Sequence, residues 1–136
     1  MASKRILIIE DSPTQSEVLA SIVTSLGCQP IVHNSLSKGV VQILTEDTPD
    51  VVLLDLRLLD DDGNSIADGF QICREIKKSQ PATPVIIVSS EDIGQAGEWA
   101  RLQGADAFLQ KPFVPGDLQK LLITVCPDLG AGTEKA

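Results

Sequence analysis

Short, uninterrupted runs of apolar residues recur along the chain and limit the folds that it can adopt. The clearest are ILII at Ile6, VVLL at Val51 and VIIV at Val85, with a shorter AFL at Ala107 and a weaker PIV at Pro30. The runs are continuous rather than alternating, and they are rich in β-branched residues. Such runs are typical of strands that are covered on both faces, as in a parallel sheet flanked by helices. We therefore expect five buried strands.

Amphipathic patterns between these runs predict helices. The best-marked helix follows Ser12, which can cap it, with Pro13 at the first helical position and Gln15 completing an S-x-x-Q capping box. Apolar residues at helical spacing form stripes in four segments. These stripes are Val18, Leu19, Ile22, Val23 and Leu26; Leu36, Val40, Val41 and Leu44; Phe70, Cys73 and Ile76; and Val114, Leu118, Leu121, Leu122 and Val125.

The order of these elements predicts a doubly wound α/β fold. A weaker helical pattern lies between Glu91 and Gln103, where Gly94 and Gly97 favour a short or partly unwound helix. Strand and helix thus alternate five times, and because crossovers are right-handed, few arrangements remain. A chain of 136 residues suits one domain with a single core. We expect that domain to span residues 1–126, with a flexible C-terminal tail at 127–136.

Composition and charge exclude several classes of partner. The chain has 19 acidic against 11 basic residues, and a net charge of -8 repels nucleic-acid backbones and anionic membranes. Its three cysteines lack the close pairing of zinc or redox motifs and indicate core thiols in a reducing compartment. The first apolar run is too short for a signal peptide or a membrane-spanning helix. We therefore expect a cytoplasmic protein that binds neither nucleic acid nor membrane and whose partner is another protein.

Polar and charged residues follow the predicted strands, at the sheet edge where open α/β folds bind ligands. Glu10 and Asp11 follow the first run, and Asp55 ends the run that starts at residue 51. Ser89 ends the next run, and Lys111 follows the last one. Three carboxylates, a hydroxyl and an ammonium should therefore meet at one edge of the sheet.

Four more aspartates crowd the stretch after Asp55, at positions 60, 61, 62 and 68. A calcium loop of the EF-hand type does not fit. With Gly63 at the sixth position of such a loop, the first and twelfth ligand places fall on Leu58 and Gly69. A solvated acidic loop is the expected structure.

Four ordered motifs resemble the response regulator receiver domains of two-component signalling, the chemotaxis-regulator-like family. They are ILIIEDS, PDVVLLDL, PVIIVSS and GADAFLQKPF, and together they cover nearly the whole chain. The resemblance implies a flavodoxin-like (βα)5 sheet with strand order 2-1-3-4-5, for which the chemotaxis regulator is a known example. It also implies a stand-alone switch that a histidine kinase or phosphotransfer protein phosphorylates on Asp55. Such a chain supports phosphoryl transfer to its own aspartate and the hydrolysis of the product, but it is a signalling protein rather than an enzyme.

The residue types suit this chemistry. An aspartate can attack phosphorus as a nucleophile, but three clustered carboxylates repel one another and the incoming phosphoryl group. Mg²⁺ would relieve both repulsions, with Asp11 and Asp55 as direct ligands and Glu10 acting weakly or through water. Lys111 and the Ser89 hydroxyl are suited to neutralise charge on the phosphoryl oxygens. Each of these residues also has an alternative without a role in phosphoryl transfer. Glu10 and Asp11 could stabilise the start of a helix, Ser89 could be a turn residue, and Lys111 could be a solvated charge.

The resemblance also implies a route for the output signal. In the family, the hydroxyl residue moves toward the phosphate and an aromatic residue three places before the lysine changes rotamer. Ser89 and Phe108 occupy these positions, although plain core packing is an equal alternative for Phe108. The change alters the face built from the fourth helix and the last strand and helix. Docking of a downstream target, or homodimerisation, is expected there.

The chain departs from the family pattern after Asp55. Gly63 lies where the family usually has a glycine, but ADGFQICREIKK resembles the family's third helix, so we expect an insertion before Gly69. Arg57 and Glu91 occupy the two variable positions that tune hydrolysis of the acyl phosphate in the family. The phosphoryl lifetime does not follow from their identities.

A pseudo-receiver, which is a constitutive protein-protein interaction module, is the main alternative function. Its usual mark is loss of the aspartate, the lysine or the acidic pair, and this chain has them all. A hydrolase of the haloacid dehalogenase type needs a second aspartate two places after the nucleophile, where this chain has Arg57. A dinucleotide binder needs a glycine-rich turn after the first strand, where this chain has EDSPTQ.

Overall fold

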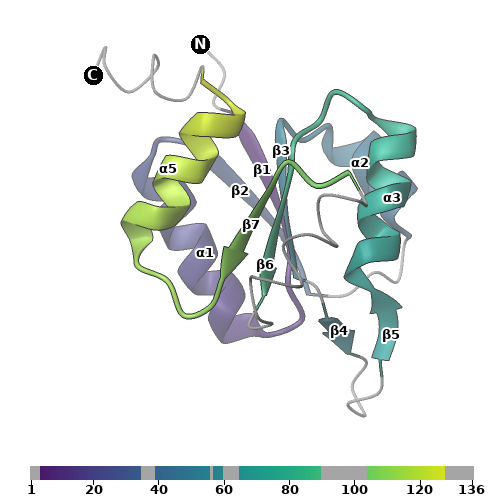
Figure 1. The fold of residues 1–136 in the computed structure, drawn as a ribbon, viewed down its shortest axis with the longest axis horizontal. Coiled ribbons are helices and arrows are strands. Elements are labelled where there is room, and N and C mark those ends of the chain that lie inside the picture. Colours follow the sequence, from purple (N-terminus) through teal and green to yellow (C-terminus); the bar gives the residue numbers. More distant parts are fainter. Residues whose placement is uncertain (1–3, 35–38, 56, 60–64, 90–103, 128–136) are drawn as a thin grey trace.

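A five-stranded parallel sheet forms the centre of the molecule, with the spatial order β2-β1-β3-β6-β7 (Figure 1). The computed structural model describes residues 4–34, 39–55, 57–59, 65–89 and 104–127, with the backbone alone for 57–59 and 65–70. The strands of this sheet are β1 (Arg5–Ile9), β2 (Gln29–His33), β3 (Val51–Asp55), β6 (Val85–Ser89) and β7 (Ala107–Gln110). In chain order they pair as 2-1-3-4-5, which confirms the predicted fold class.

Helices cover both faces of the sheet. Figure 1 shows α1 (Pro13–Ser25) and α5 (Pro115–Val125) on one face and α2 (Val40–Asp47) and α3 (Gly69–Ser79) on the other. Successive side chains of a strand point to opposite faces, so Ile6 and Ile8 pack toward α1 and α5. Leu7 and Ile9 pack toward α2 and α3. Both faces are buried, which explains why the runs are continuously apolar.

The start of α1 follows the sequence prediction only in part. Ser12 is the N-cap, its hydroxyl accepts a hydrogen bond from the backbone N–H of Gln15 at 3.3 Å, and Pro13 is the first helical residue. The reciprocal half of the predicted capping box is wrong. The backbone N–H of Ser12 donates to Glu10 Oε2 at 3.3 Å, and the Gln15 side chain contacts Lys111 instead.

A short hairpin separates β3 from α3. It consists of β4 (Arg57–Leu59) and β5 (Ser65–Asp68), which pair antiparallel and form a sheet of their own. α3 begins at Gly69, directly after β5, which agrees with the prediction that the third helix starts there rather than after Gly63. The expected loop is wrong for the two strands, while residues 60–64 lie outside the described part of the chain.

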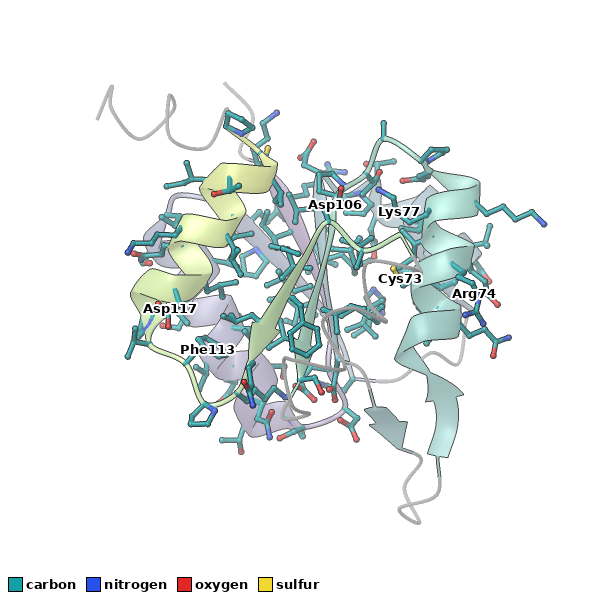
Figure 2. All side chains as sticks on the ribbon, viewed as in Figure 1. Cys73, Arg74, Lys77, Asp106, Phe113 and Asp117 are labelled. Atoms are coloured by element: carbon teal, nitrogen blue, oxygen red, sulfur yellow. The ribbon has the colours of Figure 1, made fainter. Side chains whose placement is uncertain are left out.

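Hydrogen bonds of Lys77 and Asp106 connect α3 to the sheet near the amino ends of two strands (Figure 2). The Lys77 ammonium donates to the backbone carbonyl of Thr83 and to Asp106 Oδ2, each at 3.0 Å. The same Asp106 oxygen accepts the backbone N–H of Val85 at 2.8 Å. The network therefore joins α3 to the starts of β6 and β7.

The remaining expectations concern the cysteines, the weak helix, the C-terminal tail and membrane-spanning helices. All three cysteines are thiols rather than disulfides; Cys28 and Cys73 are buried, while Cys126 is half-buried. The expected weak helix at 91–103 and tail residues 128–136 lie outside the described residues. Among the helices of the described ranges, none has the length and apolarity needed to cross a bilayer.

Candidate functional site

The carboxyl ends of β1 and β3 bring three carboxylates together. Glu10 and Asp11 directly follow β1, and Asp55 is the last residue of β3. The strands pair in register from Ile6 with Val51 to Ile9 with Leu54, so their next residues lie side by side. One carboxylate oxygen from each of the three residues lies within 4.8 Å of the others. The predicted acidic cluster therefore forms.

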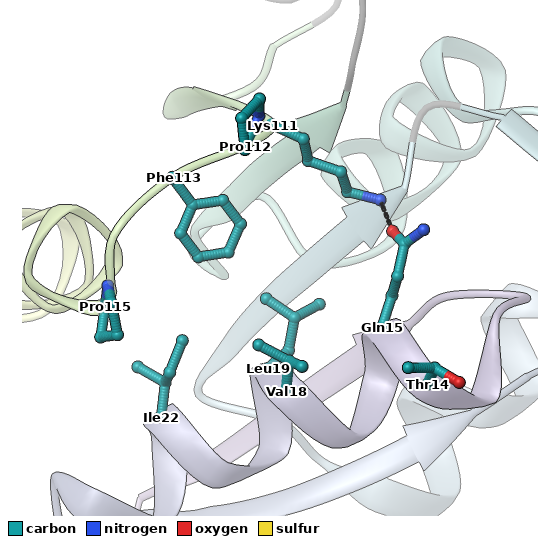
Figure 3. Close-up of a pocket in the computed structure, with 9 residues that line it drawn as sticks. All are labelled: Thr14, Gln15, Val18, Leu19, Ile22, Lys111, Pro112, Phe113 and Pro115. Carbon is teal, nitrogen blue, oxygen red and sulfur yellow. Dashed lines mark hydrogen bonds between the residues drawn. The ribbon is translucent and has the colours of Figure 1, made fainter.

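The Lys111 ammonium lies next to this cluster. Its Nζ donates to Glu10 Oε1 at 2.7 Å and lies 3.9 Å from Asp55 Oδ1. A further hydrogen bond joins Nζ to Gln15 Oε1, on the first turn of α1 (Figure 3). The backbone fixes the lysine as well, because its N–H donates to the carbonyl of Ser89 at 2.7 Å. Lys111 thus connects the end of β7 to β1, β3 and β6.

Glu10 is buried and held by several hydrogen bonds. Only 2% of its surface is exposed, and its two carboxylate oxygens accept from Lys111 and from the backbone N–H of Ser12. Its backbone N–H donates to the carbonyl of His33 at 3.1 Å, and its carbonyl accepts from Asn34 Nδ2 at 2.7 Å. Since both of its oxygens already have donors, Glu10 is better suited to orienting its neighbours than to direct ligation of an ion.

The donor set fits a hard divalent cation. Three carboxylates within 4.8 Å of one another offer oxygen ligands alone, which is the preference of Mg²⁺. Asp11 and Asp55 are half-buried, so part of each residue reaches solvent. These two residues could hold an ion directly, with Glu10 beside them.

The structure describes the side chains of two of the other predicted residues, Ser89 and Phe108, but not those of Arg57 and Glu91. Ser89 is buried, with 3% of its surface exposed, and ends β6 next to the strand that ends in Asp55. Phe108 lies in β7, half-buried against the core that β1, α2 and α3 share. Arg57 lies in β4, where only the backbone is described, and Glu91 lies outside the described residues.

Sequence reasoning missed two residues that support the site. Asn34 follows β2 and donates both to the carbonyl of Glu10 and to Ser16 Oγ at 3.1 Å. Its position just after a strand next to β1 was a usable signal, because the carboxyl ends of parallel strands meet at one edge. The contact of Gln15 with Lys111 spans 96 residues of sequence and had no local signal.

A family model for the response regulator receiver domain matches residues 6–123. This chain belongs to that family. The matched range contains both edge strands of the five-stranded sheet, β2 and β7, and the whole acidic cluster.

Relatives of known name and structure agree with this assignment. The chain is 34% identical over 123 residues to protein PilH of Pseudomonas aeruginosa, covering 89% of this chain and 93% of PilH. It is 32% identical to the transcriptional regulatory protein GlrR of Escherichia coli, of which it spans only 22%. The crystal structure of a response regulator receiver domain protein from Clostridium thermocellum superposes with a TM-score of 0.79 at 27% identity, covering 92% of this chain and 95% of that one.

Proposed function

We propose that this receiver domain is a switch that accepts a phosphoryl group on Asp55. The observation that carries the proposal is the convergence of Glu10, Asp11, Asp55 and Lys111 at one sheet edge. A cluster of three carboxylates and one ammonium offers a nucleophile, anionic ligands for a cation and a counter-charge for phosphoryl oxygens.

The transfer step uses the carboxylate of Asp55. One of its oxygens attacks phosphorus, the bond from phosphorus to the donor's nitrogen or oxygen breaks, and an acyl phosphate forms. The Lys111 ammonium, 3.9 Å from Asp55 Oδ1, can then donate to a phosphoryl oxygen. Ser89 is proposed to donate its hydroxyl to another of these oxygens. Magnesium, when bound by Asp11 and Asp55, supplies charge neutralisation at the same oxygens.

The phosphodonor is proposed to be a histidine kinase or a phosphotransfer protein, and the output partner a downstream protein. Ser89 and Phe108 form the proposed route away from the phosphoryl group. Register supports this route, because Phe108 pairs with Ile87 in β6, two residues before Ser89. Movement at either residue would alter the face that contains β7 and α5, where a target or a second copy of the chain would dock.

Mass measurement after incubation with acetyl phosphate and Mg²⁺ tests the proposal. The wild type should gain one phosphoryl group that hydroxylamine removes, whereas Asp55→Asn should gain none. Asp117→Asn is a matched control, because Asp117 is exposed in the first turn of α5. Chelation of Mg²⁺ should abolish the gain. A wild type that stays unmodified would support a constitutive interaction module instead.

A further inference from the structure

The side chain of Gln15 makes a contact that the family assignment does not explain. It reaches from the first turn of α1 to the Lys111 ammonium, which donates to its Oε1 (Figure 3). The sequence predicts that this side chain caps its own helix. Instead, the helix start is capped by the hydroxyl of Ser12 and the carboxylate of Glu10, which leaves the amide of Gln15 available for the lysine.

The hydrogen bonds of Lys111 leave one N–H for a further acceptor. A lysine ammonium carries three N–H donors. Two of them serve Glu10 Oε1, at 2.7 Å, and Gln15 Oε1. Asp55 Oδ1, at 3.9 Å, is too far for a hydrogen bond and close enough for an ion pair. The ammonium is therefore held from two sides and stands back from the nucleophile.

Gln15 lies at the surface beside a pocket whose lining is mostly apolar. Gln15 and Lys111 lie at one end of a pocket of about 500 Å³ between α1 and the segment that joins β7 to α5 (Figure 3). Its other lining residues are Thr14, Val18, Leu19, Ile22, Pro112, Phe113 and Pro115. Among these residues, Thr14 alone has a polar side chain. Without the Gln15 oxygen, the ammonium can move toward the carboxylate of Asp55, whose Oδ1 lies 3.9 Å away.

We propose that Gln15 is a positioning residue for phosphoryl transfer to Asp55. Together with Glu10, its amide oxygen keeps the Lys111 ammonium off the nucleophile and reserves one N–H for the phosphoryl oxygen. When the amide is lost, the ammonium moves closer to Asp55, and the ion pair of 3.9 Å becomes a direct hydrogen bond. That pair makes the carboxylate a poorer nucleophile and occupies the space that the phosphoryl group needs. This inference rests on the proposed function.

The kinetic test compares three variants at saturating acetyl phosphate and Mg²⁺. Gln15→Met keeps the shape of the side chain without its acceptor, and its phosphorylation should be about three- to tenfold slower, as expected for one lost hydrogen bond at an exposed position. Gln15→Glu restores an oxygen acceptor and should recover most of the rate. Gln42→Met is the matched control, because Gln42 lies on α2 and donates to Glu46 Oε1. An unchanged rate in Gln15→Met would overturn the inference.

A second comparison shows whether Gln15 acts through the lysine. In a Lys111→Met background, Gln15→Met should cause no further loss of rate, because the group that it positions is gone. Equal losses in the two backgrounds would mean that Gln15 acts independently of Lys111, and the inference would be wrong.

Nuclear magnetic resonance of lysine ammonium groups gives a readout without phosphorylation. The Lys111 ammonium signal should shift in Gln15→Met and stay in place in Gln42→Met. A stationary signal in Gln15→Met would overturn the inference even if rates changed. Failure of the wild type to accept a phosphoryl group would overturn the proposed function and this inference together, whereas a phosphorylated wild type with an unaffected Gln15→Met would overturn the inference alone.

Discussion

Burial raises the pKa values of two cysteine thiols in this molecule. Cys73 on α3 is completely buried, and burial is the main cause that raises the pKa of its thiol from 9.0 to about 11. The nearby cations of Lys77 and Arg74 act in the opposite direction but do not cancel that effect. Burial also raises the pKa of Cys28. These thiols are therefore inert core residues, as the sequence predicts.

The first prediction is that Cys73 makes stability depend on pH in the alkaline range. Between pH 9.0 and about 11, the unfolded chain loses the thiol proton while the folded protein keeps it. The stabilisation is complete below the lower value and is lost as pH rises through the upper one, amounting to about 3 kcal/mol for the wild type. Urea unfolding at a series of pH values should give a shallower fall for Cys73→Ala than for Cys126→Ala. Equal slopes would contradict the assignment.

At the scale of elements, the position of Lys111 depends on how β7 is anchored. The start of β7 is joined to α3 and β6 through Asp106, whose Oδ2 accepts from Lys77 Nζ and from the Val85 backbone. The end of β7 is joined to β6 through the hydrogen bond from the Lys111 N–H to the carbonyl of Ser89. The strand β7 is therefore fixed at both ends, and so is the backbone position of Lys111.

The second prediction concerns this anchor. Asp106→Ala should lower the free energy of unfolding by about 1–2 kcal/mol, because it removes two acceptor contacts at a partly exposed site. Asp106→Asn should cost less, because its amide oxygen can still accept the Val85 N–H. Chemical denaturation measures both. If the two variants lose the same free energy, the ion pair with Lys77 dominates and the backbone contact contributes little.

The elements also show which features the sequence could predict. The five strands and the start of α1 follow from local patterns, and the site residues follow from the ends of those strands. The aspartates after Asp55 predict a loop where the β4–β5 hairpin lies, although Leu58 and Ala67 pair across it. The signal for a hairpin is Gly63 and Asn64, residue types that favour turns, between two runs that contain apolar residues. Gln15 was misassigned because its partner is distant in sequence, which no local rule detects.

At the scale of the whole molecule, the parallel topology concentrates negative charge at one edge. The chain has a net charge of -8, and the fold places Glu10, Asp11 and Asp55 together there. Lys111 forms ion pairs with Glu10 at 2.7 Å and with Asp55 at 3.9 Å, while the carboxylates of Asp11 and Asp55 repel each other. This repulsion should therefore lower the free energy of unfolding of the ion-free protein, and a bound cation should reverse that loss.

The third prediction is that Mg²⁺ stabilises the wild type by mass action. At a hundredfold excess over Kd, binding to the folded state alone adds about 2.7 kcal/mol, which thermal unfolding detects as a rise in Tm. Asp11→Asn should raise the Tm of the ion-free protein, because it removes one repelling charge, and should lose most of the rise with Mg²⁺, because it removes a ligand. Asp117→Asn makes the same change of charge on α5 and should keep the wild-type response. A full Mg²⁺ response in Asp11→Asn would mean that the ion binds elsewhere. The opposite signs of the two effects in one variant separate a metal ligand from a residue that merely contributes to net charge.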